Sequence, residues 1–340
     1  MTGPMSDPVS DPVSDPPSQN SGGSGDDARA RLGAVRTEVA KAVVGQDAAV
    51  SGLLVALLCG GHVLMEGVPG VAKTLLVRSL AEALSVRTRR VQFTPDLMPG
   101  DITGSMVIDG TRGELTFREG PVFTHLLLAD EINRTPPKTQ SALLEAMEEG
   151  QVSVDGVSHP LPRPFLVAAT QNPVEYEGTY PLPEAQLDRF LLKVVMPVPD
   201  RDAELEVVTR HAAGFDPRDV AASGVTAVAG ADDIADGQRA VRDVQVSPEI
   251  AAYVVDVARA TRQSPSLGLG ASPRGAVALM RTARAWAWLT GRGFVTPDDV
   301  KALAQATLAH RLSLRPEAEL EGVDVSAVLA SALGSVPVPR

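Results

Sequence analysis

The chain contains little cysteine and few aromatic residues. Among its 340 residues Cys59 is the one cysteine, which excludes a disulfide framework and cysteine-based metal clusters. Cys59 lies in an apolar stretch, so we expect it to pack rather than to act as a nucleophile. Aromatic residues make up 4% of the chain and hydrophobic residues 44%, which predicts a core of Ala, Val and Leu. A chain of this length and composition can form two domains.

Basic residues and long hydrophobic runs are also scarce. Lys and Arg number 31 against 42 Asp and Glu, which gives a net charge of -11. A nucleic-acid-binding surface needs clustered basic residues, so we expect no nucleic-acid partner. The apolar stretch 52–59 is too short to span a bilayer. The N-terminus also lacks the basic start and apolar centre of a signal peptide. We therefore expect a cytoplasmic protein without direct membrane insertion.

A phosphate-binding loop is the most informative feature that is present. Residues 67–74 read Gly-Val-Pro-Gly-Val-Ala-Lys-Thr, between an apolar run typical of a buried strand and a segment of helical period. In such a loop the backbone N–H groups and the helix N-terminus attract phosphates. Lys73 adds a full charge near the terminal phosphates, and Thr74 offers a hydroxyl to Mg²⁺. Ala72 replaces the usual glycine, and we expect its methyl group to be tolerated only at negative φ.

Polar side chains end the next two apolar runs. Residues 123–131 form a continuous apolar run, typical of a buried parallel strand, that ends in Asp130 and Glu131. Residues 164–173 form another such run, with Asn172 near its end. Ligands collect at the carboxyl ends of parallel strands. We expect Asp130 to hold Mg²⁺ through its water shell and Glu131 to polarise the attacking water. Asn172 would hydrogen-bond that water or the γ-phosphate.

Six short motifs follow one another along the chain. They are Val44-Gly-Gln46, Gly67 to Thr74, Asp130-Glu-Ile-Asn-Arg134, Thr170-Gln-Asn-Pro173, Leu182-Pro-Glu-Ala-Gln-Leu-Asp-Arg-Phe190 and Ala271-Ser-Pro-Arg-Gly275. Together they resemble the MoxR branch of the AAA+ ATPases, over roughly residues 28–314. Alanine before the lysine is usual in that branch, so Ala72 supports the resemblance. The resemblance implies an α/β P-loop AAA+ core, with a parallel sheet between helices, followed by a small all-helical lid domain.

The resemblance also implies roles for individual residues. The nucleotide-binding residues it implies are Val44, Gly45, Gln46, Gly67, Val68, Pro69, Gly70, Val71, Ala72, Lys73, Thr74, Leu75 and Arg274. The first three would lie near the adenine. Asn172 resembles the first sensor and Arg274 the second. Arg189 resembles the arginine finger, which reaches the nucleotide of a neighbouring subunit, and Arg134 is a second interface candidate.

Composition divides the chain into three parts. Residues 1–27 are rich in Pro, Ser, Gly and Asp and cannot bury enough apolar surface to offset the entropy of ordering, which predicts a disordered tail. Residues 28–199 alternate between strand and helix patterns, as in a parallel sheet covered by helices on both faces. Residues 200–340 follow a helical pattern and form the expected lid domain.

Three helix starts in the expected lid are marked by a capping residue followed by proline. Ser247, Ser272 and Thr296 each precede a proline, which loses no hydrogen bond at the first helical position. Arg274 then falls in the first turn of a helix, where a cation opposes the helix dipole. That placement suits a residue directed at phosphate.

Two features interrupt the expected core. Residues 92–120 read as an insertion before the acidic strand, and residues 150–160 carry an Asp-Gly turn between alternating residues, typical of a hairpin. In the MoxR branch such segments resemble loops that face the pore of a ring or its client. A surface hairpin without client contact is the alternative.

The resemblance implies an enzyme that hydrolyses ATP with Mg²⁺ and acts as a chaperone-like remodeller. It implies a homo-oligomeric ring, commonly a hexamer, a partner with a von Willebrand A-type domain, and a protein client. A metal-chelatase motor subunit is the nearest alternative. A nucleic-acid helicase motor would need basic residues on the hairpin at 151–160, which has none. A non-hydrolysing ATP-binding scaffold is disfavoured by the presence of both Glu131 and Arg189.

Overall fold

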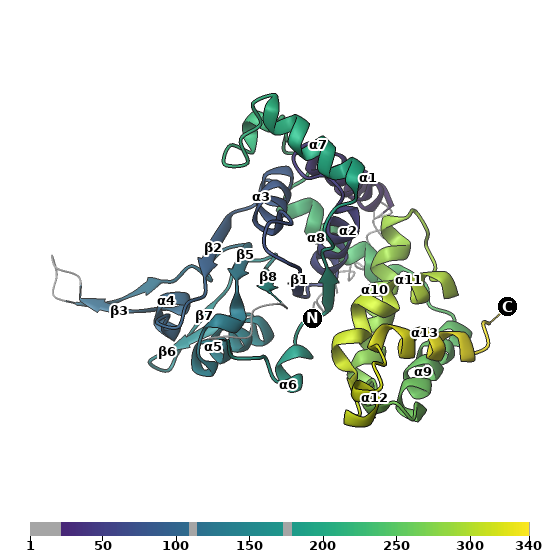
Figure 1. The fold of residues 1–340 in the computed structure, drawn as a ribbon. Coiled ribbons are helices and arrows are strands. Elements are labelled where there is room, and N and C mark those ends of the chain that lie inside the picture. Colours follow the sequence, from purple (N-terminus) through teal and green to yellow (C-terminus); the bar gives the residue numbers. More distant parts are fainter. Residues whose placement is uncertain (1–21, 109–113, 173–178, 340) are drawn as a thin grey trace, which may run out of the picture.

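The computed structural model describes residues 22–108, 114–172 and 179–339 (Figure 1). Its centre is a parallel five-stranded sheet in the order β2-β5-β8-β1-β9. The strands are β1 (Val63–Glu66), β2 (Thr88–Gln92), β5 (Leu126–Asp130), β8 (Leu166–Gln171) and β9 (Leu192–Val195). Because all five run the same way, their carboxyl ends meet at one edge. The predicted fold class is confirmed.

Helices cover both faces of the sheet. They are α1 (Gly22–Ala40), α2 (Asp47–Leu58), α3 (Lys73–Ala83) and α5 (Pro137–Glu149). Side chains alternate between the faces of a strand, so neighbours along β1 enter different cores. Val63 and Met65 join the hydrophobic cluster that contains α1, α2 and α3, whereas Leu64 joins the one that contains α5. The sheet is thereby fixed between two buried layers, which positions its carboxyl edge.

The first helix begins earlier than composition predicts. Residues 1–21 of the predicted tail lie outside the described residues, but α1 starts at Gly22 rather than near Ala28. Ala28 is buried, and Arg31 forms an ion pair of 3.0 Å with Asp233 of α8 (Ala231–Asp243). Contacts from a segment about 200 residues away therefore stabilise a helix start whose own composition does not predict it.

Two hairpins and a short helix decorate the core: the expected hairpin at 150–160, and a helix and a second hairpin within the expected insertion. They are α4 (Pro99–Thr103), the pair β3 (Gly104–Ile108) and β4 (Leu115–Glu119), and the pair β6 (Gln151–Val154) and β7 (Val157–Pro160). Asp155 and Gly156 have φ of 48° and 80°, the left-handed turn that the Asp-Gly pair predicts. The ring of Phe117 stacks on His159 with 3.9 Å between centroids, which joins the two hairpins. Figure 1 shows β3 projecting away from the body of the molecule.

The rest of the chain is mainly helical. The elements are η1 (Ile132–Arg134), α6 (Glu184–Leu187), α7 (Arg201–Ala212), η2 (Ala221–Ser223), α8, α9 (Pro248–Gln263), β10 (Leu267–Leu269), α10 (Pro273–Leu289), α11 (Pro297–Leu308), η3 (Ala309–Arg311), β11 (Ser313–Leu314), α12 (Pro316–Leu320) and α13 (Val325–Ser335). Ser247, Ser272 and Thr296 cap α9, α10 and α11 through their side chains. All three predicted helix starts are confirmed.

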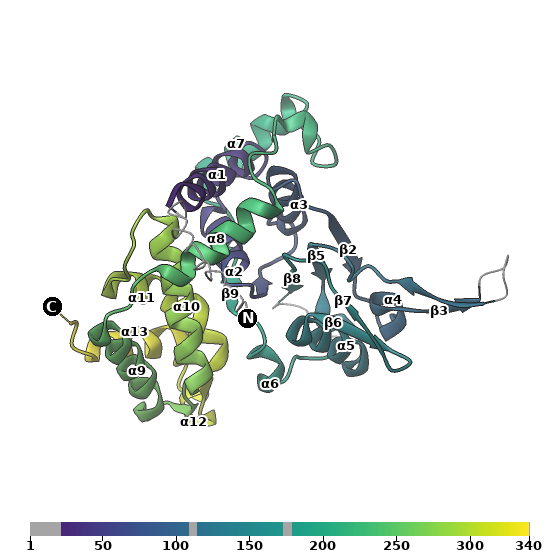
Figure 2. The same ribbon diagram turned by 180° about the vertical axis from the view of Figure 1, so that it is seen from behind.

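The helical part and the core share one hydrophobic cluster. Helix α8 lies across α1 and α2 (Figure 2). Gly237 of α8 marks the crossing, because a β-carbon there would stand 2.7 Å from Leu58 and 3.1 Å from both Leu32 and Trp288. Trp288 of α10 is therefore a packing residue. Within the described part of the chain, no helix combines the length and apolar character needed to cross a membrane.

Candidate active site

The loop of residues 67–74 connects β1 to α3 at the carboxyl edge of the sheet. Lys73, the first residue of α3, extends back along the loop and donates from Nζ to the Gly67 carbonyl oxygen at 2.5 Å. Its Nζ also lies 3.5 Å from the Gln171 carbonyl oxygen at the end of β8. Gly67 lies close to the backbone that follows β9, since a β-carbon at position 67 would stand 2.7 Å from the Met196 carbonyl oxygen. The lysine is thus held over the loop and between two strand ends.

Ala72 contradicts the expectation of negative φ. Its backbone is left-handed, with φ 64° and ψ 25°, at the residue that precedes α3. The turn into the helix requires this conformation, which costs a residue with a β-carbon about 1–2 kcal/mol. The loop therefore carries local strain that a glycine would relieve.

The Thr170 hydroxyl organises the two adjacent carboxylates. It donates to Asp130 Oδ1 at 2.6 Å and accepts from the Glu131 backbone N–H at 2.8 Å. Asp130 Oδ2 accepts from Arg90 of β2 at 2.7 Å. Sequence reasoning missed both partners, although Thr170 lies inside the Thr-Gln-Asn motif. The arrangement fixes Asp130 at the end of β5 and directs Glu131 beyond it.

Glu131 adopts a strained backbone. Its φ is 59°, and it is one of the four non-glycine residues with positive φ in the described chain, of which Ala72 is another. Gln92 donates to Glu131 Oε2 at 2.6 Å, and Arg134 Nε lies 3.1 Å from the same oxygen. Strain of this kind concentrates at functional sites.

The phosphate loop and the two carboxylates line one cavity of about 390 Å³. The expected site residues that line it are Pro69, Gly70, Ala72, Lys73, Thr74, Leu75, Asp130, Glu131 and Asn172. Asn172 is buried and lines the cavity. Arg78 and Arg218 also line the cavity and were not predicted. Hydroxyl and carboxylate oxygens are the donors that Mg²⁺ prefers, so Thr74 and Asp130 fit that ion.

A second, more apolar cavity of about 680 Å³ adjoins the loop on its other side. Val44 and Gln46, which were expected near the adenine, line it together with Val68 and Val71 of the loop. Gly45 is not among its lining residues, and a β-carbon there would stand 3.3 Å from Ala203 and 3.7 Å from Pro199. The φ of Gly45 is 73°, a conformation that glycine adopts without strain.

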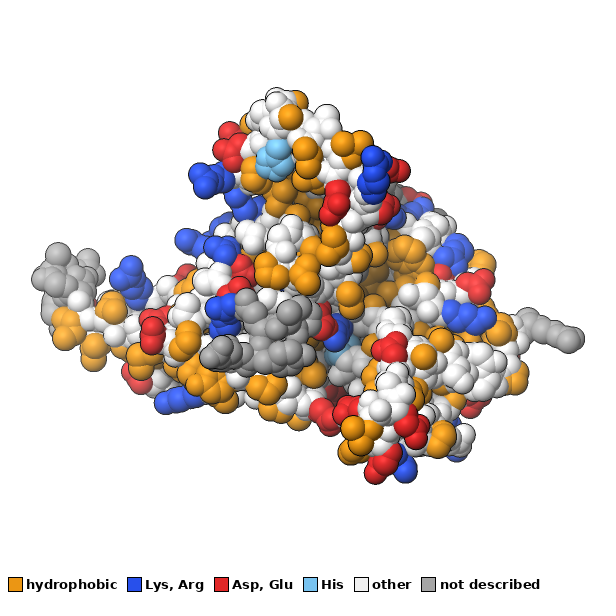
Figure 3. Space-filling model, viewed as in Figure 1, with side chains coloured by type: hydrophobic (Ala, Val, Ile, Leu, Met, Phe, Trp, Pro, Cys, Tyr) orange, Lys and Arg blue, Asp and Glu red, His pale blue; other side chains and the backbone are white. Residues whose placement is uncertain are grey.

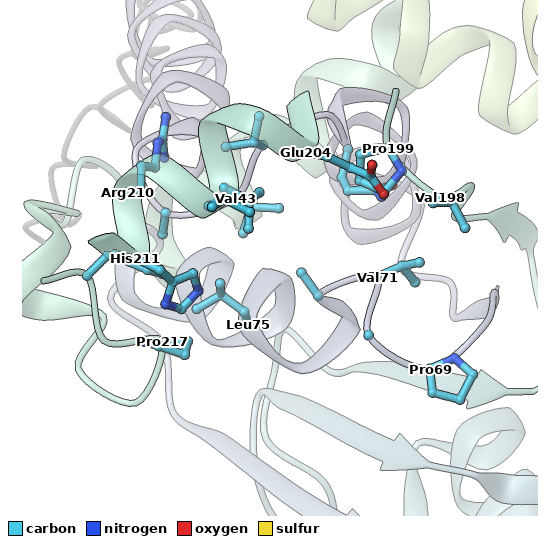
Figure 4. A pocket seen from close by; sticks show the side chains of 18 of the residues that line it. Val43, Pro69, Val71, Leu75, Val198, Pro199, Glu204, Arg210, His211 and Pro217 are labelled. Atoms are coloured by element: carbon cyan, nitrogen blue, oxygen red, sulfur yellow. The ribbon is translucent and has the colours of Figure 1, made fainter. Parts of the chain in front are cut away.

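Helix α7 supplies a wall of this pocket that sequence reasoning missed. Figure 4 shows His211 of α7 beside Leu75 of α3, with Glu204 and Arg210 on the same helix. Hydrophobic side chains gather on this face below α7 (Figure 3). Val208 of α7 is exposed and lines the pocket. Its sequence context did not mark it as a pocket residue, because that role depends on where α7 packs against the core.

The two predicted arginines lie elsewhere. Arg189 and Arg274 line neither cavity. Leu191 donates its backbone N–H to the His62 carbonyl oxygen at 2.9 Å, which places the Arg189 segment at the amino end of β1. The phosphate loop follows the other end of β1, about 10 Å further along at 3.3 Å per residue. Arg189 therefore lies near the amino ends of the strands, whereas Lys73 lies at their carboxyl ends.

The structure brings these two arginines together. Arg189 Nε lies 3.0 Å from Glu148 Oε2 at the end of α5, and Arg274 lies 3.5 Å from Glu148 Oε1. Arg274 also lies 3.8 Å from Asp188. Both guanidinium groups are partly exposed, so they form a basic pair at the surface with a shared acidic partner. Glu148 carried no recognisable signal in the sequence, whereas Asp188 lies inside the motif of residues 182–190 but was not assigned a role.

Comparison with known proteins identifies relatives of the whole chain. A family model of the ATPases associated with various cellular activities matches residues 62–192, and a model of the AAA lid domain matches residues 259–332. The chain is 46% identical over 314 residues to the uncharacterised protein YeaC of Bacillus subtilis, covering 92% of this chain and 97% of that one. It is 42% identical over 315 residues to the chaperone MoxR1 of Mycobacterium tuberculosis, covering 89% and 81%. The crystal structure of a candidate ATPase from Cytophaga hutchinsonii superposes with a TM-score of 0.85 at 39% identity, covering 93% of this chain and 97% of that chain.

Proposed function

The chain belongs to the MoxR family of AAA+ ATPases, and we propose that it hydrolyses Mg-ATP between neighbouring subunits of a ring to remodel a protein client. The observation that carries the proposal is the cavity in which Lys73, Asp130 and Glu131 meet. A cation, a candidate metal ligand and a candidate base converge there at the carboxyl edge of the sheet. These are the groups that phosphoryl transfer to water requires.

Each residue of the cavity has a distinct task. Lys73 and the loop N–H groups would bind the phosphates, and Thr74 and Asp130 would hold Mg²⁺, which would neutralise phosphate charge. Glu131 accepts a hydrogen bond from the attacking water and directs it, while Asn172 binds the same water or the γ-phosphate. The Thr170 bond keeps Glu131 in the strained conformation that aims it into the cavity.

The position of Arg189 favours action on a neighbouring subunit. A residue at the far edge of the sheet from its own phosphate loop cannot contact its own nucleotide. In a closed ring each subunit presents one face to the next, so this edge can meet the neighbour's cavity. Arg189 and Arg274 would then offset the charge that develops on the neighbour's phosphates. By this proposal each active site is complete only in the assembly.

The relatives guide the proposal for partners. One relative of high coverage is named a chaperone, which favours a protein client. We propose a hexameric ring in the cytoplasm that works with a protein carrying a von Willebrand A-type domain. The hairpins β3–β4 and β6–β7 project from the core and would contact the client. A metal-chelatase motor would share the ATP site, and the partner that co-purifies with the ring distinguishes the two.

Two substitutions test the ATP site. Glu131→Gln should retain nucleotide binding and lose nearly all turnover, because an amide cannot polarise the water in the same way. Lys73→Ala should weaken nucleotide binding itself, by about 3 kcal/mol. Binding is measured with a fluorescent ATP analogue and turnover by phosphate release. Wild-type turnover in Glu131→Gln would refute the assigned role.

A further inference from the structure

The lid holds the backbone of the segment that carries Arg189. The side chain of Arg311, in η3, is 4% exposed and donates to the carbonyl oxygens of Phe190 at 2.8 Å and Leu191 at 3.2 Å. His310 Nε2 lies 3.0 Å from the same Phe190 oxygen. Burial lowers the pKa of His310 to about 3, so its imidazole is neutral and can donate to that carbonyl group through Nε2. Two consecutive lid residues therefore bind the chain directly after Arg189.

One carboxylate links this anchor to the second arginine. Asp188 Oδ1 accepts from Arg311 Nε at 2.7 Å, and Asp188 Oδ2 lies 3.8 Å from Arg274 Nε. Arg274 and Arg189 in turn share Glu148. The three arginines and two carboxylates thus form a single network between η3, the start of α10 and the segment before β9.

Gly275 makes room for this network. A β-carbon at position 275 would stand 3.3 Å from Cδ of Arg311 and 3.4 Å from Leu308. The stem of Arg311 therefore passes closely over the first turn of α10, next to Arg274, before it reaches Asp188. The position of Arg274 and the anchoring of Arg189 depend on the same piece of lid.

We propose that Arg311 is a positioning residue that fastens the Arg189 segment to the lid, so that Arg189 and Arg274 reach the neighbouring subunit's nucleotide as one unit. The inference rests on the proposed action of Arg189 in trans. A planar guanidinium has five donors spread over a fixed fork, whereas the compact ammonium of a lysine has three, so lysine cannot reach all the oxygens that Arg311 binds. Movement of the lid would then move both arginines and alter hydrolysis in the neighbouring subunit.

The location of the hydrogen-bond partners of Arg311 distinguishes this role from simple stabilisation of the lid. Beyond the carboxylate of Asp188, Arg311 donates to the carbonyl groups of Asp188, Phe190 and Leu191. Thr307, a lid residue, accepts one further bond. An arginine that only held the lid together would have its partners within the lid, as Arg315 does with Leu267.

The first measurement compares Arg311→Met and Arg311→Lys with a matched control. In Arg281→Met the lost contact, with the Cys59 carbonyl oxygen, also joins lid and core but involves neither the arginine–carboxylate network nor the carbonyl groups that Arg311 binds. Arg311→Met should lower kcat about tenfold or more, because a small misplacement of Arg189 is costly. Arg311→Lys should lower it less, and nucleotide affinity should stay within about threefold in both variants, since the nucleotide cavities are unchanged. Arg281→Met should keep the wild-type kcat, and an equal loss in that control would overturn the proposal.

Mixed rings give the decisive readout. Arg311→Met subunits keep an intact Glu131, so mixing them with Glu131→Gln subunits should restore activity at interfaces where the latter supply Arg189. Mixing Arg311→Met with Arg189→Ala should restore nothing, because both lack a working Arg189. A general folding defect would prevent rescue with either, and that outcome would overturn the proposal.

The reference mixture separates this inference from the proposed function. One possible result is that Arg189→Ala and Glu131→Gln subunits rescue each other while Arg311→Met and Glu131→Gln subunits do not. That result would overturn the proposed role of Arg311 and leave the proposed action of Arg189 in trans intact. If the reference pair itself gives no rescue, action of Arg189 in trans and the role of Arg311 are both overturned. Should Arg311→Met fail to fold, as judged by its melting temperature, Arg311→Lys carries the same mixing test.

Discussion

Thr170 donates a 2.6 Å hydrogen bond from its hydroxyl to Asp130 Oδ1, and this bond ties the end of β8 to the end of β5. The Thr170 hydroxyl oxygen also accepts from the backbone N–H of Glu131, the residue with φ of 59°. One buried hydroxyl therefore orients the candidate metal ligand and the candidate base together.

Thr170→Val tests this relationship. The valine keeps the shape of the side chain but leaves the Glu131 N–H without its acceptor, so stability should fall by about 1–3 kcal/mol. Turnover should fall more than nucleotide affinity, because Lys73 and the loop are untouched. Urea unfolding and steady-state ATPase assays measure the two effects. Thr170→Ser keeps the hydroxyl and serves as the control, and a valine variant with the activity of the serine variant would contradict the account.

Ala72→Gly tests the strain in the phosphate loop. A glycine at φ 64° avoids the strain, which stabilises the fold by about 1–2 kcal/mol. The greater conformational entropy of glycine in the unfolded chain lowers stability by about 0.4–1 kcal/mol. The net change should be a slight stabilisation with nucleotide binding retained. Ala72→Val, which places a β-branched residue at the same φ, should lower both stability and binding. Thermal unfolding with and without ATP measures the series, and a valine variant as stable as the glycine variant would show that the loop is not strained.

Acid should destabilise the fold through two buried histidines. Burial lowers the pKa of His62 to about 4 and that of His310 to about 3, from the ordinary value of 6.5. Below pH 6.5 the unfolded chain therefore binds more protons than the folded chain. The free energy of unfolding falls as pH drops toward 4, by up to about 1.4 kcal/mol per pH unit for each histidine.

His62→Asn should reduce that slope. The asparagine oxygen can accept from the Val167 N–H in place of His62 Nδ1, but it does not titrate. The variant should be less stable at pH 7.5, because the bond to the Met147 carbonyl oxygen is lost, and should lose less stability between pH 6.5 and 4.5. Urea unfolding at several pH values gives both numbers. A slope equal to that of the wild type would assign the acid sensitivity to other groups.

The parts of the site that follow from strand order could be predicted from the sequence. Apolar runs ending in Asp130, Glu131 and Asn172 place these residues at one edge, because parallel strands align their carboxyl ends. The helix starts at Ser247 and Ser272 were equally predictable, since capping is local chemistry.

The parts that depend on contacts between distant segments could not be predicted. The start of α1 relies on α8, and the Ala72 backbone conformation on the turn into α3. Arg189 pairs with Glu148, and Arg311 binds the carbonyl oxygen of the next residue, Phe190; both partners lie far away along the chain. No periodicity reports such contacts, because they arise only when the sheet and the lid are assembled.

The central claim, that each ATP site is completed by Arg189 of a neighbouring subunit, is tested most directly by mixing two inactive variants. Arg189→Ala and Glu131→Gln should each have little turnover alone while binding ATP within a few-fold of the wild type. In mixed rings an intact Glu131 meets an intact Arg189 across some interfaces, so phosphate release should rise well above that of either variant at the same total concentration. Turnover that stays at the sum of the separate variants, in mixtures shown by light scattering to form mixed rings, would contradict the account.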